Sequence, residues 1–170
     1  MKLYKLTDQN GNTRGGTHWD AKVTHSLPHC GNPSLCSGDV LHAYTNPNLA
    51  LLINPIGANI INPILWEAEG EPCTSDWGKV GCFTLTTTKK LRLPTWTKNN
   101  KAQKVQIAFA ILCAKSVLQL YEDWYPQDDR VRKAIEAAQE YLKNPSNAAA
   151  YARIDFGVLA DEAVRMVMHR

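Results

Sequence analysis

The sequence predicts an α+β protein: a small, mostly antiparallel sheet with a short inserted helix, followed by a C-terminal part of three helices. Alternating apolar and polar residues, many of them β-branched, recur before Pro94, and Asn10-Gly11 is a strong hairpin turn signal. From Lys101 onward, apolar residues recur at the i, i+3/i+4 spacing of amphipathic helices. The change predicts a β-rich domain over residues 1–98 and a helical segment over residues 99–170 packed on it, or both within one compact domain.

Composition narrows the class of protein. The 170 residues are 44% hydrophobic and 21% charged, which is typical of a globular protein with a core. The N-terminal MKLYKLTDQNGN lacks the apolar stretch of a signal peptide, and no run of about 18 apolar residues is present. We therefore expect a cytoplasmic protein that does not bind membranes. The net charge of +3 is evenly spread, which disfavours nucleic-acid binding.

The first segments predict strands joined by loops. Residues 2–7 alternate as a strand does, and residues 13–22 are expected to return beside it with Trp19 as an apolar anchor. Residues 23–35 contain two prolines and a glycine, and we expect a long loop. Residues 40–45 form the next predicted strand.

A helix start follows this strand directly. Asn46 occupies an N-cap position, and Pro47 occupies the first helical position, where its missing N–H costs nothing. Residues 64–70 alternate again and are the predicted partner of the strand over 40–45. After a turn over 72–78, residues 79–88 should pair with 64–70.

The C-terminal third predicts three helices. The first covers residues 101–124 and ends before Pro126. The second covers residues 129–143, with Asp128 as its N-cap. A short turn of helix over 146–151 and a last amphipathic helix over 156–168 complete the chain.

A ligand site is predicted where the strand over 40–45 ends beside a helix N-terminus. Aromatic rings there can stack on a base, while arginine, histidine and capping amides can hold its phosphates. No nucleophile elbow, P-loop or dinucleotide-binding glycine pattern is present, so no catalytic residue is assigned. The predicted ligand-binding residues are Arg14, Thr17, His18, Trp19, His42, Tyr44, Asn46, Glu67 and Glu69.

The histidines and cysteines raise the questions of a zinc site and of disulfide bonds. His29, Cys30, Cys36 and His42 offer zinc ligands, but their spacings are not diagnostic, and ordinary buried cysteines and surface histidines explain them as well. We therefore expect no metal and no cofactor. The five cysteines are an odd number, and we expect no disulfide framework.

Two stretches resemble known families. Residues 1–95 resemble an uncharacterised domain family common in tailed-phage genomes and prophages. The matching motifs are Cys36, Val40-Leu41-His42-Ala43, Asn46-Pro47, Glu67-Ala68-Glu69-Gly70 and Lys79-Val80. Residues 105–145, with the text FAILCAKSVLQLYEDWYPQDDRVRKAIEAAQEYL, resemble the helical segment of immunity-like proteins.

These resemblances imply a phage or prophage accessory protein that counters host defence inside a bacterial cell. We predict that it binds and sequesters a nucleotide-derived host signal without chemistry. One alternative is an enzyme similar to ADP-ribosyltransferases, in which Tyr4, Tyr44 and Glu67 or Glu69 would hold NAD; its first strand lacks the expected His or Arg. The other is a protein inhibitor of a host defence factor, and self-association into a homo-oligomer is also left open.

Overall fold

The computed structural model describes residues 1–35, 37–54, 56–76, 78–98 and 101–144. The chain divides into two compact units, Met1–Thr95 and Trp96–Arg170, and each is described by itself. The predicted α+β class is confirmed, because an antiparallel sheet with a short helix is followed by two further α-helices. The helical turn predicted over 146–151 and the last helix over 156–168 lie outside the described residues.

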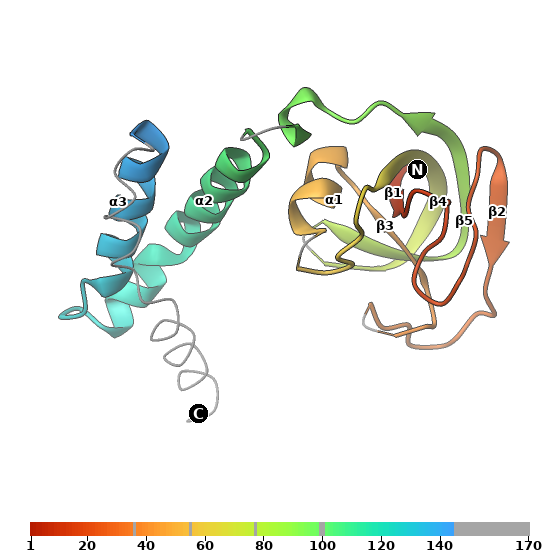
Figure 1. Ribbon diagram of the computed structural model, residues 1–170. Helices are drawn as coiled ribbons and strands as arrows, with labels where there is room; N and C mark the ends of the chain where they lie inside the picture. The colour runs from red at the N-terminus through yellow and green to blue at the C-terminus, as the bar shows by residue number, and fades with distance from the viewer. Residues whose placement is uncertain (36, 55, 77, 99–100, 145–170) are drawn as a thin grey trace. The chain divides into compact units, whose positions relative to one another are not determined.

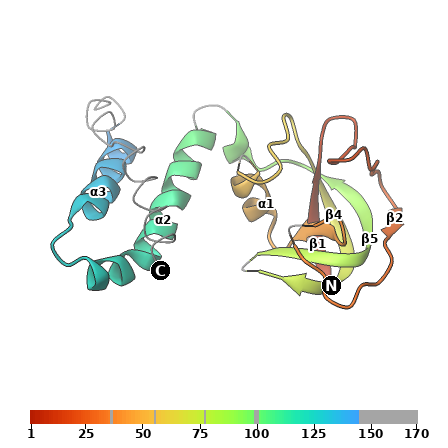
Figure 2. The same ribbon diagram turned by 90° about the horizontal axis from the view of Figure 1, so that it is seen from below.

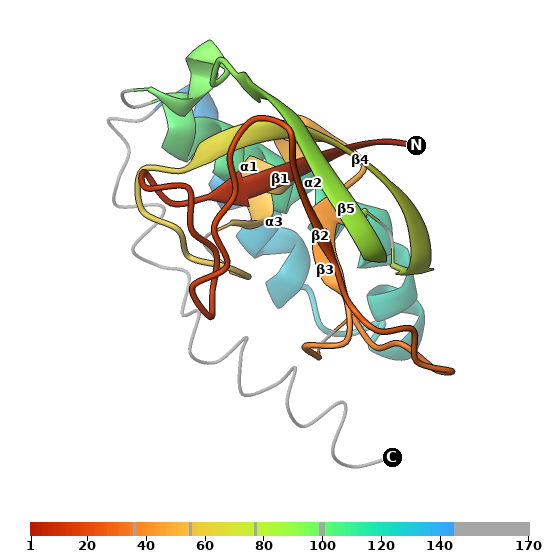
Figure 3. The same ribbon diagram turned by 90° about the vertical axis from the view of Figure 1, so that its right-hand side faces the viewer.

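Five antiparallel strands form the first unit and curl into a nearly closed sheet (Figures 1 and 3). Their order is β2-β5-β3-β1-β4, and β4 also pairs with β5, so that four of the strands complete a ring. Closure matters because it leaves few unpaired strand edges. The strands are β1 (Lys2–Thr7), β2 (Val23–Ser26), β3 (Leu41–Tyr44), β4 (Ile64–Ser75) and β5 (Lys79–Leu91).

The long β4–β5 hairpin organises this ring (Figure 2). Its turn is held by the Asp76 carboxylate, which accepts hydrogen bonds from the backbone N–H groups of Gly78 at 3.1 Å and Lys79 at 2.8 Å. A short side chain that bonds to backbone two and three residues on is the usual way in which aspartate fixes a turn. Along one edge of β5, residues 79–82 pair with β3 and residues 84–87 pair with β2.

The interior of the ring follows from strand alternation. In β1, Leu3, Lys5 and Thr7 are all buried and share one face by the two-residue period. Opposite them on β4, Ala68 pairs with Leu3 and Trp66 pairs with Lys5. The core cluster consists of Leu3, Trp19, Ala43, Ala68, Val80, Cys82 and Leu85. A lysine therefore occupies a core-facing position in an apolar interior.

Helix α1 (Pro47–Ile53) begins as the sequence predicts. The Asn46 side chain accepts hydrogen bonds from the N–H groups of Asn48 at 2.8 Å and Leu49 at 3.1 Å, and Pro47 opens the helix. After α1, the Asn54 side chain bonds to both backbone groups of Ile60, at 3.0 Å each. These two bonds give the loop that follows α1 a defined shape.

Three predictions about the sheet are wrong. Residues 13–22 form turns and one isolated bridge between Asn12 and His18 rather than a strand. The loop expected over 23–35 contains β2, whose polar sequence VTHS pairs with β5 through Thr24–Thr86 and Ser26–Thr84 hydroxyl bonds. The partners of β3 are β1 and β5 rather than β4.

The hairpin boundary also differs from the prediction. We expected a turn over 72–78, but β4 continues through Pro72 to Ser75. It does so with register irregularities on either side of Pro72, because proline has no N–H to donate to the sheet.

In the second unit, a short 3-10 turn, η1 (Thr95–Thr97), precedes two long helices that pack side by side. They are α2 (Lys101–Trp124) and α3 (Arg130–Lys143). At their junction, the Asp128 carboxylate accepts a hydrogen bond from Tyr121 at 2.7 Å and pairs with Arg130. The N-cap position is Asp129 rather than Asp128, although Asp128 does accept the Arg130 N–H at 3.0 Å.

Four large apolar side chains on α2, those of Leu112, Val117, Leu120 and Trp124, are exposed to solvent. Leu112 is 66% exposed, Leu120 is 64% exposed and Trp124 is 67% exposed, whereas only Ile111 of this helix is buried. By length and composition alone, α2 is also long and apolar enough to cross a membrane, with a mean hydropathy of 1.3 over its best window. One helix of this kind is weak evidence for a membrane span.

Candidate functional site

A cavity of about 790 Å³ lies within the first unit. Ligand pockets in proteins commonly have volumes of about 300–1,000 Å³. Its walls come from β1, the turn over 13–19, the segments over 27–35 and 37–44, the loop after α1, and the β4–β5 turn. The polar or charged side chains that line it are Lys5, Thr13, Arg14, Thr17, Trp19, Ser37, His42, Tyr44, Asp76 and Lys79.

Lys5 supplies the most unusual charge in this cavity. Its side chain is only 7% exposed, and Nζ donates a hydrogen bond of 2.7 Å to the carbonyl oxygen of His42. Nζ also lies 4.7 Å from the ring centroid of Trp19, as a cation–π pair does. In the described part of the chain, no carboxylate lies within ion-pair distance of Lys5. Burial, with Lys79 adding to it, lowers the pKa of Lys5 to about 8.

His42 and Lys79 bind the same backbone oxygen, that of Leu35. The carbonyl of Leu35 accepts a hydrogen bond from His42 Nε2 and another, at 3.4 Å, from Lys79 Nζ. Because a carbonyl can only accept, His42 carries its proton on Nε2, and Nδ1 remains an acceptor in the neutral ring. Burial, the chief cause, and the two neighbouring lysines lower the pKa of His42. The imidazole is therefore neutral at pH 7.

Tyr44 and Asp76 are further ionisable residues in the cavity lining. Tyr44 lies opposite Lys79 in the β3–β5 register, and burial, with a smaller contribution from Asp76, raises the pKa of its hydroxyl. The Asp76 carboxylate is already engaged by two N–H groups of the β4–β5 turn. Lys5, Arg14 and Lys79 thus outnumber the single carboxylate of the lining, so the cavity favours anions.

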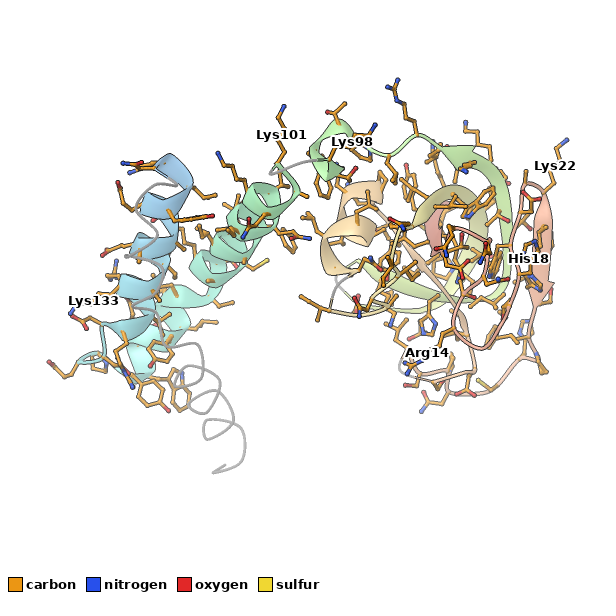
Figure 4. All side chains as sticks on the ribbon, in the orientation of Figure 1. Arg14, His18, Lys22, Lys98, Lys101 and Lys133 are labelled. Atoms are coloured by element: carbon orange, nitrogen blue, oxygen red, sulfur yellow. The ribbon has the colours of Figure 1, made fainter. Side chains whose placement is uncertain are left out.

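Five of the nine predicted ligand-binding residues line the cavity: Arg14, Thr17, Trp19, His42 and Tyr44. Arg14 is exposed at a loop that Figure 4 shows at the lower end of the sheet unit. Trp19, by contrast, is 1% exposed, with its indole N–H donating to the Thr13 hydroxyl at 3.2 Å. The ring of Trp19 therefore packs in the core and faces Lys5 rather than offering a free stacking surface.

The other four predicted residues, His18, Asn46, Glu67 and Glu69, are not among those that line the cavity. His18 Nδ1 lies 3.1 Å from the Asn12 side-chain oxygen, and the side-chain oxygen of Asn46 caps α1. Glu67 forms ion pairs with Lys2 at 2.6 Å and Lys89 at 3.3 Å, and the bond with Lys2 is the chief cause that lowers its pKa.

The residues discussed as zinc ligands have separate surroundings. His29 stacks on Phe83 with ring centroids 4.3 Å apart, Cys30 is exposed, and His42 faces Leu35. Cys36 lies outside the described residues. Within the ranges that the structure describes, no group of three or more histidine, cysteine or acidic side chains is arranged to hold a metal ion.

Lys5 and Lys79 were not predicted as site residues. The signal for Lys5 is present in the sequence, since the two-residue period of KLYKLT places it on the same face as Leu3. A lysine at a core-facing strand position is rare unless its charge has a partner. Lys79 gave no comparable signal, because its role depends on the turn that brings it beside Leu35.

Comparison with known proteins concerns the second unit. Residues 97–160 match the family model described as Imm-5 like putative immunity protein. This segment is similar to immunity proteins. The match confirms the immunity-like resemblance of the helical part, and α2 and α3 are its described portion. No curated protein and no solved structure matches the chain.

Proposed function

We propose that the first unit binds an anionic, nucleotide-type small molecule in its cavity and retains it without chemistry. The observation that carries this proposal is the buried ammonium of Lys5, which lines the cavity and has no carboxylate partner among the described residues. A buried charge without a counter-charge is costly, and a bound anion would remove that cost. The cavity thus has a place for the negative group of a ligand.

The remaining walls fit the other end of such a ligand. Beyond the cationic groups, the lining is largely aliphatic, with Leu27 and Leu35 on one segment and Ile53, Ile56 and Ile60 around the loop after α1. A purine or nicotinamide ring is flat and apolar on its faces, so it can pack against such side chains. A phosphate can meanwhile accept charged hydrogen bonds from Lys5 and Lys79.

Binding without chemistry is favoured over the enzymatic alternative by the position of Glu67. The β-sheet register places Tyr4 between Tyr44 and Glu67, so the residues named for the NAD-using alternative lie on neighbouring strands. However, the Glu67 carboxylate is paired with Lys2 and Lys89, and Glu67 is not among the residues that line the cavity.

We propose that the chain acts as a phage-type accessory protein that sequesters a nucleotide-derived host signal in a bacterial cell.

Calorimetry with a panel of cyclic nucleotides, ADP and ADP-ribose tests the proposal. We expect at least one member to bind, and Lys79→Met to weaken that binding about tenfold or more, because a hydrogen bond to a charged group is lost. Lys22→Met is the matched control, since Lys22 is exposed and does not line the cavity. Absence of binding by the whole panel, or equal losses in both variants, would overturn the proposal. NAD turnover that disappears in Glu67→Gln would support the enzyme instead.

The second unit supports a second candidate, binding of a protein partner. Its similarity to immunity proteins, together with exposed Leu112, Val117 and Leu120 on α2, favours a protein-binding surface. We expect a host-lysate protein retained by the full chain to be lost when Leu120 is changed to Glu. Gln119→Glu, which adds the same charge beside it, should retain that protein. Retention by both variants, or by neither, would contradict this candidate.

A further inference from the structure

The surroundings of the Lys5 amine favour nucleophilic reactivity as well as anion binding. Its Nζ lies at the cavity with its position fixed by the 2.7 Å hydrogen bond to the His42 carbonyl and by the Trp19 ring. It is desolvated and has a second cation, Lys79, near it. Desolvation and a neighbouring cation are the two conditions that make a lysine amine nucleophilic at moderate pH.

We propose that Lys5 forms a reversible imine with the aldehyde group of an anionic ligand in this cavity. This inference rests on the proposed function and changes it in one respect: the ligand, a phosphorylated compound with a free aldehyde, is held by a reversible covalent bond as well as by charge. The open-chain form of a ribose phosphate, as at the reducing end of an ADP-ribose-type nucleotide, belongs to that class.

The reaction balances without a further reactant. The Lys5 ammonium releases one proton to solvent, and the neutral nitrogen attacks the carbonyl carbon, so that a C–N bond forms and the carbonyl oxygen becomes a hydroxyl. Loss of that hydroxyl with the remaining nitrogen proton, as water, breaks the C–O bond and leaves the C=N bond. Addition of water reverses the sequence.

The charges around the amine favour an anionic aldehyde over a neutral one. The cationic side chain of Lys79 hydrogen-bonds to the Leu35 carbonyl near the amine, while burial favours the neutral form of His42 and Asp76 is held by the β4–β5 turn. A phosphate attracted to Lys79 would place the ligand next to Lys5, and proximity of this kind accelerates bond formation. With its pKa near 8, Lys5 has on the order of a hundredfold more neutral amine at pH 8 than an ordinary lysine.

Pyridoxal 5′-phosphate, a phosphorylated aldehyde, is a suitable probe for the full-length protein. After incubation at pH 8 and reduction with cyanoborohydride, peptide mass spectrometry locates the modified lysines. We expect Lys5 to be modified at least about tenfold faster than the exposed lysines Lys22, Lys98 and Lys133. Figure 4 marks the positions of these three surface lysines. Pyridoxal, which lacks the phosphate, should label Lys5 more slowly. Equal labelling of Lys5 and the surface lysines, or equal rates for the two aldehydes, would overturn the inference.

A conservative variant separates this inference from the proposed function. Lys5→Arg keeps the positive charge and cannot form an imine, whereas Lys22→Arg is the matched surface change. Binding of ADP by both the parent and Lys5→Arg, with no adduct on Lys5 of the parent, would refute the imine and leave the proposed function intact. An adduct confined to Lys5 without binding of any nucleotide would support the imine and refute the nucleotide ligand.

Discussion

The two units of this protein bury their apolar residues very differently. The ring of strands in the first unit encloses a core in which Leu3, Ala43, Ala68 and Leu85 are fully buried. In the described part of the second unit, the buried hydrophobic residues are Ile111 and Ile135, one on each helix. A unit with its own core can hold a shaped cavity, whereas a helical pair with exposed apolar residues offers a surface. The difference supports a small-molecule site in the first unit and a protein-binding surface in the second.

The largest expected effect sharpens this comparison. Leu85→Ala should lower the free energy of unfolding by about 2–5 kcal/mol, because it opens a cavity in the core of the ring. Leu120→Ala removes the same atoms from a side chain that is 64% exposed and should cost no more than about 0.5 kcal/mol. Urea denaturation of the full chain measures both. A loss of stability from Leu120→Ala as large as that from Leu85→Ala would contradict the view that Leu120 lies on an exposed surface.

A second, smaller effect concerns the buried charge. Lys5 has a pKa of about 8 in the folded protein and an ordinary value of 10.5 when unfolded, so the unfolded chain binds more protons between these values. The contribution of Lys5 to stability should therefore rise with pH from about 8 to 10.5, by about 3 kcal/mol.

Lys5→Met tests this contribution, because it removes the titrating amine and replaces no other residue. The difference in unfolding free energy between Lys5→Met and the parent should be largest near pH 7 and should shrink as the pH approaches 10. Urea denaturation of both proteins at several pH values measures it. A constant difference would mean that Lys5 keeps an ordinary pKa in the fold.

The smallest expected effect separates a capping residue from a ligand-binding one. Asn46→Ala removes the oxygen that caps α1 and should cost about 1 kcal/mol, whereas Asn46→Ser keeps an acceptor and should cost little. Neither variant should change nucleotide affinity, because Asn46 is not among the residues that line the cavity. Thermal unfolding and calorimetry check the two expectations. Weaker ligand binding by Asn46→Ala with unchanged stability would show that Asn46 contacts the ligand and is not mainly a helix cap.

Local signals in the sequence were sufficient for the elements that depend on local chemistry. The Asn46-Pro47 start of α1, the strand over 40–45 and the helix over 101–124 are all confirmed, because caps and periodicity act within a few residues. Strand β2 was missed because VTHS has little apolar character, and its hydroxyl pairs with Thr84 and Thr86 become visible only when the strands meet. Pairing of distant strands depends on tertiary contacts of this kind.

Some residues of the candidate site could also be predicted from local sequence signals, and others could not. His42 and Tyr44 follow from their place at the end of a strand, and both line the cavity. Lys79 could not be predicted, since the turn at Asp76 and the carbonyl of Leu35, far apart in the chain, define its position. Glu67 has an exposed-strand pattern, and its partners Lys2 and Lys89 come from two neighbouring strands.

The most direct test of the central claim is a calorimetric titration of the full chain with ADP at pH 7 and at pH 9.5, beside Lys5→Arg. If Lys5 holds the anion, affinity of the parent should fall about tenfold or more between the two pH values, as the ammonium with a pKa near 8 loses its charge. Lys5→Arg, which stays charged, should bind equally at both. Absence of binding at pH 7 by ADP and by every other nucleotide of the panel, or the same affinity at both pH values in the parent, would contradict the account.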